Sequence, residues 1–206
     1  MNDSNIKSNS EINLNFLKLN FMKATKFFVP IFLVAFLFVG CSDDDDGENP
    51  EPVNEEELIT TMRVTLVPQG GGDTILLESK DLDGDGPDAP EISVSDLTAD
   101  TTYDGAILLL NETETPAEDI TEEVAEEDED HQFFFEGSGS ITGVSYSDAD
   151  GDGNPIGILF EMTTGGAGDA TLAITLRHEP KKPNDGTLVD AGGETDIAQT
   201  FSVSVQ

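Results

Sequence analysis

From residue 58 onward, apolar and polar residues alternate in short runs that are separated by turn residues. In residues 61–67, Met62, Val64 and Leu66 share one face while polar residues occupy the other. A period of two is typical of a strand with one buried face. Further runs follow at 74–78, 91–94, 103–110, 131–135, 140–146, 156–163, 170–178 and 196–205. About nine strands, joined by turn residues, predict an all-β fold, an antiparallel β-sandwich over residues 58–206.

One segment between these runs has a helical pattern. Residues 115–118, Thr-Pro-Ala-Glu, have the form of a capping box with proline at the first helical position. Ala117, Ile120 and Val124 then form a narrow apolar stripe among acidic residues. We expect one short acidic helix over residues 116–128 that lies on the sandwich, with a solvated acidic loop as the alternative.

The chain before the sandwich contains an apolar run at residues 27–39, preceded by Lys23 and Lys26. The run is shorter than the ~20 residues that span a bilayer, which favours a signal peptide. We therefore interpret 22–40 as a signal peptide that begins at Met22, and 1–21 as an over-extended N-terminus. Residues 47–57 are rich in Pro, Asn and Glu, which predicts that 41–57 form a disordered acidic tether after the signal peptide.

The end of the apolar run, Leu37-Phe38-Val39-Gly40-Cys41, resembles the lipobox of bacterial lipoproteins, with Phe38 where leucine is usual. The resemblance implies that Cys41 is lipidated and anchors the protein to a membrane. The acidic run Ser42–Asp46 resembles the surface-export signal of Bacteroidetes lipoproteins, which implies an outer-membrane location facing the cell exterior. The alternatives are a plain secretory signal with an incidental cysteine and a solvated spacer.

Within the domain, Leu97, Thr101 and Tyr103 have the spacing of the tyrosine corner found in fibronectin type III and other immunoglobulin-like sandwiches. The resemblance implies that the Tyr103 hydroxyl bonds to the backbone at the entry to a central strand. Stretches such as 129–134 and 192–197 also resemble uncharacterised acidic lipoproteins of the flavobacterial type, a likeness that implies no particular activity.

The formal net charge of −34 restricts the possible partners. Such a field repels phosphate backbones, which excludes nucleic acid as a partner. It favours a cation or a basic surface as ligand, and a merely solvated acidic surface is the alternative.

Two loops, the first beginning at Asp81 and the second at Asp148, carry Asp at positions 1, 3 and 5 and Gly at position 6. The first half of an EF-hand loop has the same pattern. Both lack the Glu of position 12, where Ile92 and Leu159 stand, and so they resemble the calcium loops of extracellular β-proteins. The candidate Ca²⁺ ligands are Asp81, Asp83, Asp85, Asp148, Asp150, Asp152 and Asn154. Alternatively, these Asp-Gly runs are ordinary turns.

The two histidines form a second candidate site. His131 begins a predicted strand after Glu129, and His178 ends another before Glu179. If these strand ends adjoin, the histidines and a nearby carboxylate suit Zn²⁺ or another transition metal. Isolated histidines with local hydrogen bonds are the alternative.

No nucleophile motif accompanies these sites, and Cys41 is the single cysteine, so we expect neither an enzyme nor an organic cofactor. The sequence favours a non-enzymatic binding lipoprotein that captures a metal ion or small ligand beside a TonB-dependent outer-membrane receptor. The alternative is a structural or adhesive surface domain whose Asp loops bind Ca²⁺ for rigidity.

Overall fold

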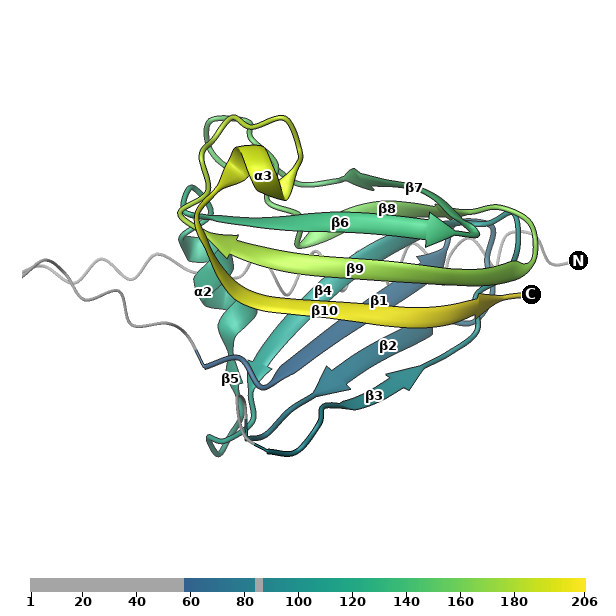
Figure 1. Ribbon diagram of the computed structural model, residues 1–206, viewed down its shortest axis with the longest axis horizontal. Helices are drawn as coiled ribbons and strands as arrows, with labels where there is room; N and C mark the ends of the chain where they lie inside the picture. The colour runs from purple at the N-terminus through teal and green to yellow at the C-terminus, as the bar shows by residue number, and fades with distance from the viewer. Residues whose placement is uncertain (1–57, 84–86) are drawn as a thin grey trace, which may run out of the picture.

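The computed structural model describes residues 58–83 and 87–206, which form two antiparallel β-sheets packed face to face (Figure 1). The predicted all-β sandwich is confirmed. The predicted signal peptide, Cys41, the tether and Asp85 lie outside the described residues. Within the described ranges, no helix combines the length and apolar character that a bilayer crossing needs.

The larger sheet has the strand order β3-β2-β1-β4-β8-β7, and the short β5 pairs with β4. Its strands are β1 (Thr61–Pro68), β2 (Ile75–Lys80), β3 (Glu91–Val94), β4 (Thr102–Asn111), β5 (Glu118–Asp119), β7 (Ile141–Tyr146) and β8 (Leu159–Thr164). The smaller sheet has the order β10-β9-β6, from β6 (His131–Gly139), β9 (Gly168–His178) and β10 (Glu194–Val205). The helices are α2 (Ile120–Glu126) and α3 (Leu188–Ala191).

The core lies between the inner faces of the two sheets. Met62, Val64 and Leu66 of β1 are completely buried, as the alternation predicts. The smaller sheet contributes an equivalent row from β9, namely Leu172, Ile174 and Leu176. Because side chains alternate across a strand, these two rows meet in one apolar layer while their neighbours face outward.

The tyrosine corner joins the two sheets. Tyr103 is completely buried, and its hydroxyl accepts a hydrogen bond from the Thr98 backbone N–H at 2.7 Å. Next to it, Leu97 pairs with Val205 of β10 in a parallel bridge, and the Leu97 N–H donates to the Ser204 carbonyl at 2.8 Å. The segment that enters β4 is therefore held against the edge of the smaller sheet.

The predicted helix over 116–128 is shorter in the structure, and its predicted capping box is wrong. Residues 118 and 119 pair with β4 as β5, and this competes with a helical start. The helix begins at Ile120, where Asp119 acts as N-cap and its side chain accepts from the Thr121 N–H at 3.0 Å. Ile120 and Val124 are buried as predicted, whereas Ala117 is exposed.

Two other segments differ from the sequence expectation. The run predicted as a strand from residue 156 becomes the regular strand β8 only at Leu159, because the Asp148 carboxylate accepts the Gly157 and Leu159 N–H groups. The polar segment 181–193, between the predicted strands 170–178 and 196–205, contains the single turn of α3, with Thr187 as its N-cap. Figure 1 shows α3 at the same end of the sandwich as α2.

Two strand glycines provide a test of this packing. A Cβ on Gly105 of β4 would overlap the buried ring of Phe160, whereas a Cβ on Gly143 of β7 would meet nothing. We expect Gly105→Ala to lower the free energy of unfolding by about 1–3 kcal/mol, because overpacking forces the core apart. Gly143→Ala should be neutral or slightly stabilising. Urea denaturation of both variants checks this, and equal effects would contradict the packing described here.

Candidate metal centre

His131, His178 and Asp196 come together from the three strands of the smaller sheet. His131 of β6 lies directly opposite His178 of β9, and their rings pack edge to face with centroids 4.6 Å apart. The Asp196 carboxylate lies 3.8 Å from His131 Nε2 and 4.0 Å from His178 Nδ1. One ligand atom from each residue lies within 4.8 Å of the other two. The two strand ends therefore adjoin, which is the condition that the sequence set for this candidate site.

A β-bulge directs Asp196 toward the histidines. Along β10, Thr195 lies opposite Arg177 and Ile197 lies opposite Leu176, so Asp196 is the extra residue between them. A bulge bends the strand and re-aims the inserted side chain. The Asp196 side chain is consequently only 5% exposed, although the regular alternation of β10 would have turned it outward.

His131 is held in one tautomer. Its Nδ1 lies 3.1 Å from the carbonyl oxygen of Glu127, which can only accept, so Nδ1 carries the proton. The unprotonated Nε2 is therefore directed toward the other two residues. It is completely buried and makes no hydrogen bond to the described part of the chain. A buried polar atom without a partner costs about 1–3 kcal/mol, and its retention calls for an explanation.

Helix α2 is attached to the larger sheet and places the Glu127 carbonyl that bonds to His131. The Thr121 hydroxyl accepts the N–H of Leu109 in β4 at 2.7 Å, which fixes the helix against the sheet. At its other end, Glu127 caps the helix through a backbone bond to Glu123 at 2.9 Å. The Glu127 carbonyl is thereby placed against His131. Orientation of a histidine by a hydrogen bond on its far nitrogen is usual in metal sites.

Burial lowers the pKa of His131 below its ordinary value of 6.5. The bond to Glu127 and the charge of Asp196 act in the opposite direction, and His178 adds to the lowering. The ring is therefore neutral at pH 7. Neutral imidazole is the form that binds metal ions.

Two imidazole nitrogens and one carboxylate oxygen form a donor set for Zn²⁺, Fe²⁺, Co²⁺ or Ni²⁺. Donors around a tetrahedral Zn²⁺ ion are separated by about 3.4 Å, given bond lengths near 2.0–2.1 Å. Here the separations reach 4.8 Å. The donor types suit such an ion, and the donors have to move together by up to about 1.4 Å before they can surround it.

The structure does not bring together every residue of the predicted transition-metal site. Glu129 and Glu179 are exposed and do not belong to the group. The chain turns away from β9 after His178, where the Glu179 N–H donates to the Asp130 carbonyl at 2.7 Å. The carboxylate comes instead from Asp196, which sequence reasoning missed because it is out of phase with the inward residues of its strand.

The second Asp loop uses its carboxylates to hold its own backbone. Asp148 accepts from the N–H groups of Gly157 at 2.6 Å and Leu159 at 2.7 Å, and burial raises its pKa despite these bonds. Asp150 accepts from the N–H groups of Asp152 at 3.1 Å and Asn154 at 2.8 Å. Among the residues that the structure describes, these carboxylates do not form a compact group of three.

A lysine lies where a cation would neutralise Asp150. Lys182 Nζ is 3.2 Å from Asp150 Oδ2 and also donates to the Asp128 carbonyl. Both side chains of the ion pair are buried. Burial alone would raise the pKa of Asp150, but hydrogen bonds from Asn154 and Lys182 outweigh it and the pKa is lowered. A Ca²⁺ ion at this loop would have to compete with Lys182.

The first Asp loop is only partly described. The carboxylate of Asp83 accepts from the Asp88 N–H at 3.3 Å, while Asp81 follows β2 and its N–H donates to the Thr60 carbonyl at 2.7 Å. The third predicted ligand, Asp85, lies outside the described residues. The predicted convergence of the three carboxylates stays a prediction.

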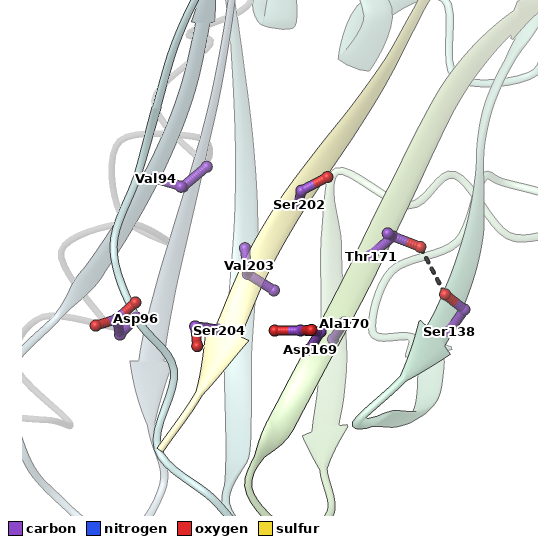
Figure 2. A pocket seen from close by; sticks show the side chains of 9 residues that line it. All are labelled: Val94, Asp96, Ser138, Asp169, Ala170, Thr171, Ser202, Val203 and Ser204. Atoms are coloured by element: carbon purple, nitrogen blue, oxygen red, sulfur yellow. Dashed lines mark hydrogen bonds between the residues drawn. The ribbon is translucent and has the colours of Figure 1, made fainter.

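Figure 2 shows the side chains that line a groove beside β10, at the opposite end of β9 from the histidines. Its lining is rich in hydroxyl groups, of which those of Ser138 and Thr171 lie 2.6 Å apart. The nearby Asp96 carboxylate accepts from the side chain of Gln206. Since the side chains of Ser138, Thr171 and Asp96 already have hydrogen-bond partners, the groove presents a weaker case for a ligand site than the His131 centre does.

No protein-family model, curated protein or solved structure matches this chain.

Substitution of Lys182 and of Lys181 compares the stability contribution of a buried ion pair with that of an exposed one. We expect Lys182→Met to cost roughly 3 kcal/mol of stability, because it leaves the buried Asp150 charge without its partner. Lys181→Met is the matched control: Lys181 pairs with Asp190 at 2.9 Å, but its side chain is 62% exposed, so little change is expected. Thermal or urea unfolding measures both. A negligible effect of Lys182→Met would contradict the role assigned to this pair.

The lowered pKa of His131 predicts a pH dependence of the metal-free protein. Because the unfolded state binds more protons between the folded pKa and about 6.5, stability due to His131 is complete above that range and is lost as pH falls through it. The difference in unfolding free energy between wild type and His131→Gln should therefore shrink as the pH is lowered from 7 to 5. Urea titrations in EDTA measure this difference, and a constant value across the range would contradict the buried neutral state.

Proposed function

We propose that this protein is a non-enzymatic binding lipoprotein of the cell envelope that captures a divalent transition metal ion at His131, His178 and Asp196. The observation that carries the proposal is the buried, unprotonated Nε2 of His131, which is directed at the other two donors. A structural histidine in a core ordinarily has partners for both nitrogens. A metal ion supplies the missing partner.

The charge of the protein supports a cation as the ligand. The formal net charge of −34 attracts cations and raises their local concentration near the surface. The mixed nitrogen and oxygen donors then select among cations, because Ca²⁺ and Mg²⁺ prefer sites made entirely of oxygen. The centre is therefore suited to Zn²⁺ and its neighbours in the first transition series.

The access to the centre supports capture of an ion. His131 is completely buried, and the His178 side chain, at 14% exposed, is the most accessible of the three. An ion would therefore enter beside His178, where the group is most open to solvent. Together with the proposed lipid anchor at Cys41, this favours a role at the outer membrane in which the protein delivers metal to a TonB-dependent receptor.

Metal titration of the purified protein tests the proposal. After removal of metal with EDTA, we expect the wild type to bind one equivalent of Zn²⁺ in calorimetry and to melt at a higher temperature with Zn²⁺ present. His131→Ala and His178→Ala should each weaken binding by at least about 100-fold. Glu129→Gln, which removes an exposed charge close in sequence, should bind as the wild type does.

Two outcomes would contradict the proposal. One is substoichiometric Zn²⁺ in the wild type, and the other is equal affinity in the wild type and both histidine variants. A parallel titration with Ca²⁺ separates the structural alternative, in which the Asp loops bind Ca²⁺: that alternative requires Ca²⁺, and not Zn²⁺, to raise the melting temperature.

A further inference from the structure

Glu194, at the start of β10, lies in the same row as the two histidines. It is paired with His178 across β10 and β9, and His178 is paired with His131 across β9 and β6. Directly opposite residues of antiparallel strands place their side chains on the same face. Glu194 is therefore on the inner face of the smaller sheet, beside the bulge that carries Asp196.

The neighbouring position confirms this register. Thr195 is paired with Arg177, and the Arg177 guanidinium donates to the Thr195 hydroxyl. These two side chains therefore share the outer face. Because side chains alternate along a strand, Glu194, which precedes Thr195, and His178, which follows Arg177, share the inner face.

The backbone that precedes Glu194 is held against the end of β9. Gly192 and Gly193 adopt positive φ angles of 61° and 71°, which fold the chain back after α3. A Cβ on Gly193 would overlap the carbonyl oxygen of His178, so this close approach requires glycine. The Glu194 backbone is thus fixed next to the metal centre, while its side chain is exposed to solvent and lies outside the group of His131, His178 and Asp196.

We propose that Glu194 supplies a fourth ligand, which closes the centre from the solvent side once an ion has entered. The proposal rests on the function proposed above. Two neutral histidines and Asp196 leave a divalent ion with one net positive charge and at least one open position. The Glu194 carboxylate neutralises that charge and fills that position. Because its side chain is long and starts beside His178, it reaches the ion from the side at which the ion enters.

Cobalt-loaded protein tests this role, because the visible spectrum of Co²⁺ reports its ligands. The variant is Glu194→Gln, and the matched control is Glu179→Gln, which removes another exposed carboxylate adjacent to His178. We expect Glu194→Gln to weaken Co²⁺ binding by about 10–100-fold. Added azide should change the spectrum of Glu194→Gln because it enters the open position, and should leave the wild type and Glu179→Gln unchanged.

The outcomes separate this proposal from the one on which it rests. If the wild type takes up no Co²⁺, the metal-binding function itself fails. If the wild type binds Co²⁺ but Glu194→Gln matches it in affinity and azide response, Glu194 is not a ligand. Equal weakening by both variants would also overturn the proposal, since it would reflect the loss of general negative charge. Melting curves of the metal-free variants establish that the fold is intact.

Discussion

The pairing of β9 with β6 on one side and β10 on the other determines both the core and the candidate metal centre. Its register turns Leu172, Ile174 and Leu176 inward, where they pack against the row from β1. The same period of two brings His178 to the inner face at the end of the strand. A shift of this register by one residue would have two effects at once: it would expose the apolar row, and it would move the two histidines apart. The pairing register of β9 therefore fixes both the stability of the sandwich and the geometry of the candidate centre.

Two buried polar arrangements occupy this end of the sandwich, and they differ in how their charges are balanced. In the first, Lys182 bonds to Asp150 and to the Asp128 carbonyl, so a cation is already built into the chain. In the second, the Asp196 carboxylate faces two histidines, of which His131 is kept neutral by its burial. The first arrangement is satisfied by protein atoms alone. The second leaves the Nε2 of His131 without a hydrogen bond, which is why it is the better candidate for an external ion.

Local patterns predicted the strands well, because alternation depends only on which residues a sheet buries. The bonds of Tyr103 were likewise predictable, since the motif places the hydroxyl and its backbone partner within one turn of chain. The helix start was mispredicted because residues 118 and 119 pair with β4, a competition that the local capping pattern does not contain. The spacing of the Asp loops predicts ion sites, which stays a prediction. In the loop that begins at Asp148, the same spacing also lets Asp148 and Asp150 accept hydrogen bonds from backbone N–H groups.

The sequence by itself determined the two-sheet architecture, the acidic surface and the identity of His131 and His178 as candidate ligands. These follow from the periodicity, composition and rarity of residue types. Only the tertiary structure decided which carboxylate joins them. Asp196 reaches the centre through a bulge, which reverses the face on which its side chain lies. Glu194 joins the row through strand pairing across a connection that contains α3. Both depend on contacts between residues distant in the chain, and those contacts exist only once the sheet has formed.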